Sequence, residues 1–396
     1  MEEARPKRLP GAFGLQLAGQ HLLEYGGHVG PADLPRDLAE LGPLADAVGV
    51  LRPLGQPLPE VGQWGMPDAL LPTAVAIATG FLCWLATGAL IPILSRRDML
   101  DYANERSSHF APTPRGGGIA VTGSVLLAWI ALHREGMAGS SAIGIALGTA
   151  LLAAVSWIDD LRGLSPGVRL MAQGAAVTIG ILVLPDTRNG LEAWLGPTLY
   201  FAAVGLVWIW WINLFNFMDG IDGLAVSEAA TICGGLLLFA IVGDSADPTR
   251  ALPTAAVLGA VIGFLAWNWS PARIFLGDVG SVPLGYLLGF LLLDLATRGR
   301  LTIALILPLY FLADATITLF RRLLSGERVW EPHRRHFYQQ AVRNGLSHTA
   351  VVKRVIAANL LLIGCSWAAE NGWATLAIVA AIVIVAALLV ALAAGR

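Results

Sequence analysis

Charged residues are scarce in this sequence. Asp, Glu, Lys and Arg make up 14% of its 396 residues, whereas they make up about 25% of a soluble domain. The formal net charge is −2, so a basic surface of the kind that binds nucleic acid is not expected. Hydrophobic residues reach 56%, and this balance indicates a chain that folds in a lipid bilayer.

Cysteine is rare as well. The three cysteines, Cys83, Cys233 and Cys365, all fall within apolar segments, and no C-x-x-C or Cys/His spacing occurs. A zinc site or a redox pair is therefore not expected. Cysteines in such positions act as small buried hydrophobic residues.

Long apolar runs are absent from the first 67 residues, which contain 9 of the 22 prolines and 11 of the 45 glycines. Such a density of Pro and Gly interrupts helices and strands. We predict a disordered N-terminal extension over 1–67, followed by a membrane domain over 68–396.

Beyond this extension, apolar runs approach the roughly 20 residues that cross a bilayer as a helix. Lipid cannot hydrogen-bond to backbone groups, so the runs must be helical. The sequence therefore predicts an all-α, polytopic membrane helix bundle with about 11 transmembrane helices. The predicted spans are 69–94, 116–132, 141–157, 170–185, 197–213, 224–242, 251–267, 281–296, 300–319, 351–369 and 373–393.

Lys and Arg are distributed unequally between the two alternating sets of loops. One set, with the flanking Lys353 and Arg354, holds 16 of them, and the other holds 5. Because loops rich in Lys and Arg stay in the cytoplasm, the first set is predicted to be cytoplasmic. We expect a multi-pass membrane protein whose longer, charge-rich loops face the cytoplasm.

Five aspartates lie at the ends of apolar spans on the predicted cytoplasmic side. They are Asp159, Asp160, Asp219, Asp222 and Asp278. For any one of them alone, a functional role and a structural one, as a solvated loop acid or a helix cap, are equally good interpretations. Five of them at three helix ends on one side indicate a functional site, because ionisable groups at membrane depth are costly to maintain. Hard oxygen ligands of this kind suit Mg²⁺, with Mn²⁺ as a substitute, shared with substrate phosphates.

Basic residues gather in two other predicted cytoplasmic segments. His333, Arg334, Arg335 and His336 are expected to bind phosphate, because arginine forks match phosphate oxygens. A zinc site would need a third ligand, which the spacing does not supply. Arg115, in Pro-Thr-Pro-Arg-Gly-Gly-Gly, either binds an acceptor phosphate or anchors its helix. Arg321 and Arg322 read as membrane anchors, and Asp314 is spaced to pair with Arg321 along a helix.

Three blocks carry a resemblance to a known family. They read D-D-L-R-G-L from Asp159, N-L-F-N-F-M-D-G-I-D-G-L from Asn213, and F-L-G-D-V-G-S from Phe275. In this order, they resemble the polyprenyl-phosphate N-acetylhexosamine-1-phosphate transferase superfamily over about residues 69 to 350. The resemblance implies a Mg²⁺-dependent enzyme that moves a sugar-1-phosphate from a UDP-N-acetylhexosamine to undecaprenyl phosphate and releases UMP.

The resemblance also implies residue roles. Asp278 matches a metal ligand and Asn216 a residue that assists metal or pyrophosphate binding. Asp222 matches the position facing the uracil ring, and Asp159 and Asp160 match the pair proposed to contact the acceptor phosphate or act as base. Asn213 and Asp219, in the same block as Asn216, are expected to bind substrate.

The last cytoplasmic loop departs from one branch of this superfamily. The peptidoglycan branch, phospho-N-acetylmuramoyl-pentapeptide transferase, carries three consecutive histidines where this chain reads His333-Arg334-Arg335-His336. This loop and the Pro-Thr-Pro-Arg-Gly-Gly-Gly entry resemble the branch that initiates O-antigen and other surface polysaccharides. The pentapeptide transferase remains the alternative.

Two further classes compete with a transferase. A divalent-cation or anion transporter would place its site near the bilayer midplane, often between inverted repeats. A scaffold would not concentrate carboxylates at helix ends. We expect direct displacement rather than a phosphoryl-aspartate intermediate, since an acceptor phosphate with a second pKa near about 6 is already mostly dianionic at pH 7. The sequence leaves the sugar, the polyprenol length and the oligomeric state open, a homodimer included.

Overall fold

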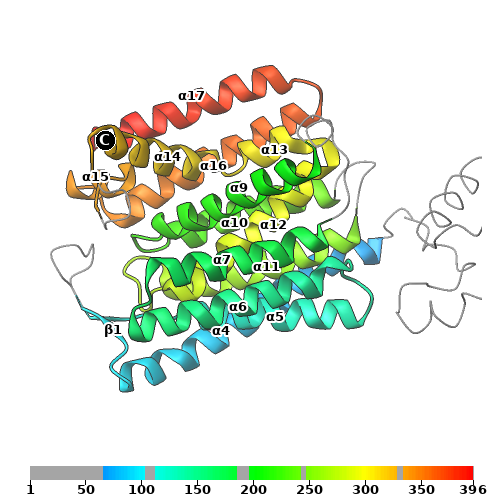
Figure 1. Ribbon diagram of the computed structural model, residues 1–396, viewed down its shortest axis with the longest axis horizontal. Coiled ribbons are helices and arrows are strands. Elements are labelled where there is room, and N and C mark those ends of the chain that lie inside the picture. Colours follow the sequence, from blue (N-terminus) through cyan, green and yellow to red (C-terminus); the bar gives the residue numbers. More distant parts are fainter. Residues whose placement is uncertain (1–65, 103–111, 185–195, 242–246, 328–332, 396) are drawn as a thin grey trace, which may run out of the picture. The chain divides into compact units, whose positions relative to one another are not determined.

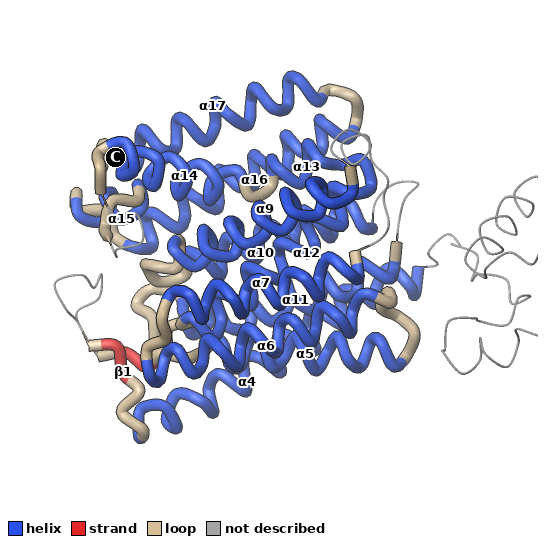
Figure 2. Tube along the Cα trace, in the orientation of Figure 1, coloured by secondary structure: helices blue, strands red, loops and turns tan. Residues whose placement is uncertain are grey.

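The structure is a computed structural model that describes residues 66–102, 112–184, 196–241, 247–327 and 333–395. The predicted disordered extension over 1–67 lies outside these residues, except that its last two positions begin the first described helix. Apart from one two-stranded pair, the described residues form helices and the loops between them (Figure 2).

Each of the eleven predicted spans contains a helix, so the all-helical, polytopic fold is confirmed (Figure 1). The long helices are α4 Met66–Arg96, α5 Gly118–Arg134, α6 Ser141–Arg162, α7 Pro166–Val183, α9 Pro197–Phe217, α10 Leu224–Ile241, α11 Pro248–Asn268, α12 Asp278–Leu295, α14 Leu309–Leu324, α16 His348–Glu370 and α17 Ala374–Ala393. The shorter elements are β1 Leu100–Asp101, β2 Thr113–Pro114, η1 Ala296–Arg300, α13 Leu301–Ile306 and α15 Phe337–Arg343.

The count of membrane spans differs from the prediction. Within the described residues, nine helical segments are long and apolar enough to cross a membrane. Helix α5 has only 17 residues, and the predicted span 300–319 is divided between α13 and α14. The helical path is distorted at Arg298 and Gly299, where the glycine has a φ of 83°, and Pro308 caps the start of α14. A positive φ and a proline each interrupt a regular helix.

Helix α12 lies at the centre of the bundle. In its most apolar stretch 89% of the residues are buried, whereas in α4 the corresponding share is 17%. A helix that is apolar on all sides is typically surrounded by others. In the core, the Trp208 ring of α9 stacks on Tyr286 of α12 with 4.8 Å between centroids, and the Tyr286 hydroxyl donates to the carbonyl of Ala176 in α7. Asp278, the first residue of α12, is thereby held at the middle of one end of the bundle.

Candidate functional site

Two of the predicted acidic segments meet across one arginine. Asp159 and Asp160 lie in the last turn of α6, and Asp278 begins α12. The Nη2 atom of Arg115 lies 2.9 Å from Oδ1 of Asp160 and 2.9 Å from Oδ1 of Asp278. Residues 118 positions apart in the sequence therefore form one cluster of charge.

Backbone contacts hold this arginine in place. The N–H of Phe275 donates to the carbonyl of Pro114, at 2.8 Å, and the N–H groups of Gly116 and Gly117 donate to the carbonyl of Phe275. The Gly118 N–H donates to the carbonyl of Leu276, also at 2.8 Å. The Pro-Thr-Pro-Arg-Gly-Gly-Gly and Phe-Leu-Gly-Asp segments thus dock on each other through their main chains.

Glycine makes this docking possible. A Cβ built on Gly118 would lie 2.1 Å from the Cα of Gly280, which is closer than any real side chain comes. The start of α5 therefore touches the start of α12 backbone to backbone, a close approach that glycine allows in membrane helices. Gly277 precedes Asp278 with a φ of 74°, a conformation that glycine adopts without strain.

The start of α12 also holds the two aspartates of the Arg115 bridge. Oδ2 of Asp160 accepts from the backbone N–H of Val279 at 3.2 Å, and Asp278 is itself in the first turn. Unpaired N–H groups at a helix N-terminus favour negative charge. In the last turn of α9, Oδ1 of Asn216 accepts from the Ser281 hydroxyl, so α9 is fixed to the same turn of α12.

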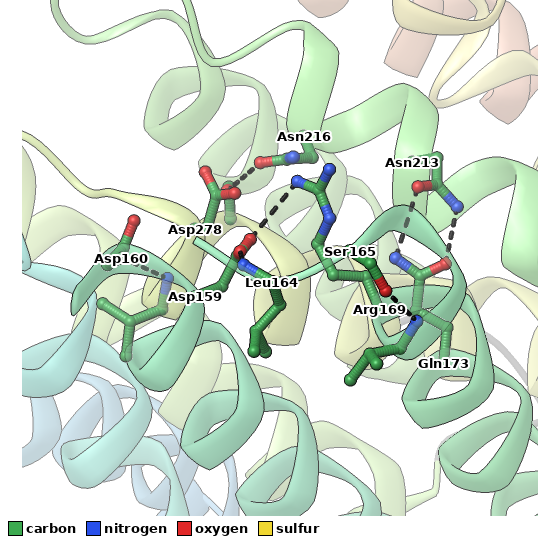
Figure 3. Close-up of polar contacts among 12 residues, drawn as sticks. Asp159, Asp160, Leu164, Ser165, Arg169, Gln173, Asn213, Asn216 and Asp278 are labelled. Carbon is green, nitrogen blue, oxygen red and sulfur yellow. Dashed lines mark hydrogen bonds and ion pairs between the residues drawn. The ribbon is translucent and has the colours of Figure 1, made fainter. Parts of the chain in front are cut away.

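Arg169 and Gln173 of α7 are site residues that the sequence reasoning missed (Figure 3). Nη1 of Arg169 lies 3.2 Å from Oδ2 of Asp159, whose Oδ1 accepts from the backbone N–H of Leu164 at 2.6 Å. Gln173 and Asn213 exchange two amide hydrogen bonds, of 3.2 and 2.7 Å. The available signal was position: Arg169 and Gln173 occupy successive turns directly after the Asp-Asp block.

These side chains line one end of a cavity of about 720 Å³. Its polar end is formed by Asp159, Arg169, Gln173, Asn213, Asn216 and Asp278. The other walls are mainly apolar and come from α6, α7, α9, α12 and α14, including Leu206, Ile209, Leu319, Phe320 and Leu323. The cavity suits a molecule with a charged head and a long apolar tail.

Negative charge exceeds what the arginine offsets at this end of the bundle. Burial disfavours the charged form of Arg115, but Asp278, Asp160, Asp101 and Asp219 outweigh it and raise the pKa of the guanidinium. Burial, followed by repulsion from Asp278, raises the pKa of Asp219 to about 7. A further cation is therefore electrostatically favoured among these carboxylates.

The donor set fits Mg²⁺ with shared ligands. Carboxylate oxygens of Asp278 and the amide oxygen of Asn216 are hard donors, as this ion requires. Among the described residues, no group of three or more His, Cys, Asp or Glu side chains could hold a metal alone. The remaining ligands would come from substrate phosphates and water, which is how Mg²⁺ is commonly held.

Comparison with known proteins matches this architecture to a family. Residues 142–296, which include α6 to α12, match the family model "Glycosyl transferase family 4". The phospho-N-acetylmuramoyl-pentapeptide-transferase of Mycolicibacterium paratuberculosis is 30% identical over 328 residues, covering 69% of this chain and 89% of the relative. The chain belongs to glycosyl transferase family 4. Enzymes of the same name from Mycobacterium leprae (30% over 329 residues; 69% and 89%) and Kocuria rhizophila (29% over 362 residues; 73% and 93%) are also similar.

The match to glycosyl transferase family 4 contains most, but not all, of the cluster. Asp159, Asp160, Asn216 and Asp278 fall within residues 142–296, whereas Arg115 lies outside them. In this family 4 chain, the polar end of the cavity is therefore built on the matched helices, whereas the α14 wall and the bridging arginine come from segments outside the match.

Asp222 lies apart from the Arg115 bridge. Its Oδ2 is 3.2 Å from Nδ1 of His348 and accepts from the backbone N–H of Ala272 at 3.2 Å. Burial disfavours the carboxylate, but these contacts outweigh burial, and the pKa of Asp222 is lowered. It is therefore charged at neutral pH, and its contact with a uracil ring remains a prediction.

In this family 4 transferase, the four residues of the His333–His336 segment lie in different surroundings. His336 is 2% exposed, and its Nδ1 lies 3.2 Å from Oδ1 of Asp314. His333 stacks on His336, and burial together with His336 lowers the pKa of His333 to about 4. Arg334 and Arg335 line a second cavity, described below. Phosphate binding by the four residues remains a prediction. In the structure, the Nδ1 atom of His336 is already occupied by the buried carboxylate of Asp314.

Asp314 does not pair with Arg321, so that expectation was wrong. Instead, Asp314 is fully buried and accepts from the backbone N–H groups of Phe337 and Tyr338, at 3.0 and 3.2 Å. The guanidinium of Arg321 lies 5.0 Å from the centroid of the Phe337 ring. A buried carboxylate is stable only when donors saturate it, and the first turn of α15 supplies two of them.

Tyr338 of α15 also contacts the Asn213–Leu224 block. Its hydroxyl donates to the carbonyl of Phe217 at 3.0 Å. A Cβ built on Gly220 would lie 2.2 Å from the Tyr338 hydroxyl oxygen. The turn that carries Asp219 therefore rests on the Tyr338 side chain. The loop order along the chain did not reveal this support, because it depends on how the buried Tyr338 packs against the turn after α9.

Proposed function

We propose that this family 4 transferase moves an N-acetylated hexosamine-1-phosphate from a UDP-sugar to undecaprenyl phosphate and releases UMP, as the first step of a lipid-linked surface glycan. The observation that carries the proposal is the single cavity whose polar end holds Asp159, Arg169 and Asp278 and whose other walls are apolar. A polyprenyl phosphate has the same division into a charged head and an apolar tail.

The acceptor phosphate fits beside Arg169. The guanidinium of Arg169 lines the cavity and pairs with Asp159. The forked geometry of an arginine side chain suits a phosphate head. Beyond it, Leu206, Ile209 and Phe320 offer an apolar path for the isoprenoid chain. Side chains of Phe320 and Leu323 are each 59% exposed on the surface of α14, so the chain can enter from lipid.

The donor pyrophosphate fits at the Arg115 bridge. Arg115 already lies between two carboxylates, and its side chain is 42% exposed, so it can reach a phosphate. Asp278 and Asn216 would hold Mg²⁺, which when bound would neutralise charge on the pyrophosphate. Asp219 and Asp222, on the turn below, are expected to orient the nucleoside and sugar.

Direct displacement balances without a protein base. An oxygen of the acceptor phosphate forms a bond to the sugar-linked phosphorus, and the bond to the bridging oxygen of UMP breaks with its electron pair leaving on UMP. The dianionic acceptor carries no proton that must be removed at pH 7. Asp159 accepts from the N–H of Leu164 and pairs with Arg169, so both of its oxygens are engaged. These contacts favour a positioning role over a nucleophilic one.

A muramoyl-pentapeptide donor is the second candidate. The relatives at 29 to 30% identity carry that activity in their names. The loop argues against it, since His336 is buried on Asp314 and two arginines stand where consecutive histidines would be.

Orientation and location follow from charge. Strand β1, whose partner β2 immediately precedes Arg115, lies at the same end of the bundle as α15 (Figure 1). The Arg115 bridge, the Asp159 turn and α15 belong to loops of the set with 16 Lys and Arg. This bias supports a site facing the cytoplasm from the bacterial inner membrane.

The test is UMP release by the purified full-length protein with undecaprenyl phosphate, Mg²⁺ and a panel of UDP-N-acetylhexosamines alongside UDP-N-acetylmuramoyl-pentapeptide. We expect release with a UDP-N-acetylhexosamine. Turnover of the pentapeptide donor alone would replace the first candidate with the second, and no release with any donor would overturn both.

A further inference from the structure

A second cavity of about 380 Å³ lies at the same end of the bundle as α15. It is bounded by α14, α15 and the residues just before α15. Its most notable feature is that five arginines share its wall; we call it the arginine pocket. They are Arg321, Arg322, Arg334, Arg335 and Arg343.

Helix α14 separates the arginine pocket from the cavity that contains Asp278. Leu319 and Leu323 line the first cavity, whereas Arg321 and Ser325 line the arginine pocket. The second pair follows the first by two residues, which is about 200° around a helix of 3.6 residues per turn. The two cavities therefore face opposite sides of α14, and a phosphate in one does not occupy the other.

The arginines of the pocket are placed to surround an anion. Among the described residues, Glu327 pairs with two of them: Nε of Arg322 lies 3.1 Å from its Oε2, and Arg335 contacts its Oε1. Arg321 lies over the Phe337 ring, and Arg343 is exposed on α15. Guanidinium groups gathered around one space repel each other, and a phosphate that accepts several N–H bonds relieves this repulsion.

The pocket also lies at the depth of lipid headgroups. In the same turn of α14 as Arg321 and Arg322, the side chains of Leu323 and Leu324 are 59% and 73% exposed. Large exposed apolar side chains in a membrane protein face lipid. This turn therefore marks the edge of the bilayer, where basic groups attract anionic lipids.

We propose that the arginine pocket binds a phosphate-bearing anion that is neither the donor nor the acceptor of the transfer. Its position favours the phosphodiester headgroup of an anionic lipid as the source. The proposal stands on the pocket's own residues and does not depend on the transferase activity.

The experiment uses the full-length protein and two double variants. Arg321→Gln with Arg343→Gln removes two exposed charges of the pocket. Lys353→Gln with Arg354→Gln removes two charges from α16 on the same side, outside the pocket. Binding of short-chain phosphatidylglycerol, short-chain phosphatidylcholine and inorganic phosphate is measured in detergent at constant ionic strength. The thermal unfolding of each variant without added anion checks that it is folded.

We expect the wild type and the α16 variant to bind phosphatidylglycerol in preference to phosphatidylcholine, and the pocket variant to bind it about tenfold more weakly, as expected when charged hydrogen bonds are lost. Equal dependence on the pocket arginines for inorganic phosphate, with no preference among lipids, would support the site and make a soluble phosphate its source. Weakening by the α16 variant to the same degree, or no anion binding at all, would overturn the proposal. A raised KM for the UDP-sugar in the pocket variant, with lipid binding unchanged, would also overturn it by assigning the pocket to the donor.

Discussion

Two aspartates at the same end of the bundle, Asp278 and Asp314, have opposite surroundings. Asp278 lines a cavity, its side chain is 22% exposed, and its Oδ1 is bound by Arg115. Asp314 is 0% exposed and accepts hydrogen bonds from Tyr310, Thr318 and the loop at His336. A carboxylate that a ligand can reach serves chemistry, whereas one saturated by protein donors serves architecture. Substitution of Asp278 should therefore lower activity, whereas substitution of Asp314 should lower stability.

The largest effect is expected at Asp278. Asp278→Asn removes the charge that faces the pyrophosphate and weakens the Arg115 bridge, and we expect UMP release to fall by about 10²-fold or more, because charge-stabilising groups in active sites have effects of this size. The thermal unfolding midpoint should change little. Glu370→Gln, which removes a carboxylate paired with Arg300 elsewhere in the bundle, is the control and should retain activity. A fully active Asp278→Asn enzyme would show that the carboxylate lining the cavity is not needed for the transfer.

Asp314→Asn should act on stability first. The amide keeps one acceptor oxygen but turns an N–H₂ group toward the backbone N–H of either Phe337 or Tyr338. A buried donor left without an acceptor costs about 2 kcal/mol. Chemical unfolding in detergent would measure the loss. Activity per folded molecule, assayed at low temperature, should stay within a few-fold of wild type, in contrast to Asp278→Asn. Loss of activity without loss of stability would instead place Asp314 in the catalytic cluster.

Tyr338→Phe should have a smaller effect. It removes the hydrogen bond to the Phe217 carbonyl while keeping the ring, at a cost of about 1 kcal/mol. Because the turn that carries Asp219 rests on this hydroxyl, KM for the UDP-sugar should rise more than kcat falls. Steady-state kinetics at varied donor concentration separates the two, and a change in kcat alone would contradict the proposed support.

The smallest effect is expected from the titration of Asp219. Its pKa is raised to about 7 in the folded protein, so the folded state holds this proton more tightly than the unfolded state. The stabilisation is fully present below the carboxyl's ordinary pKa and is lost as pH rises toward about 7. In chelator, the thermal midpoint of the wild type should decline over this range more than that of Asp219→Asn. Mg²⁺ should shift the decline to lower pH, and identical profiles for the two proteins would rule out the raised pKa.

Most of the fold was predictable because lipid leaves few alternatives. A run of about 20 apolar residues must be helical, and all eleven predicted runs contain helices. The division of 300–319 was missed because it depends on Pro308, whose local effect on the helix does not disturb the apolar composition.

The site was predictable where motifs supplied its charged groups. Asp160 and Asp278 were expected together, and the structure joins them. Arg169 was missed, since its position after the Asp-Asp block does not by itself show that its side chain turns back onto Asp159. Likewise, the separation of His336 from Arg335 depends on their different partners, buried Asp314 for His336 and partly exposed Glu327 for Arg335, which a loop sequence does not reveal.

The contact between Gly118 and Gly280 means that two positions without functional groups fix the separation of Arg115 and Asp278. A methyl group at either position would push the starts of α5 and α12 apart and stretch the bridge, although it would touch neither substrate. Such a change would present itself in an assay as a defect of chemistry while its origin is steric. The two glycines thus work as a spacer, and a side chain at one of them can be accommodated only if the opposing backbone moves.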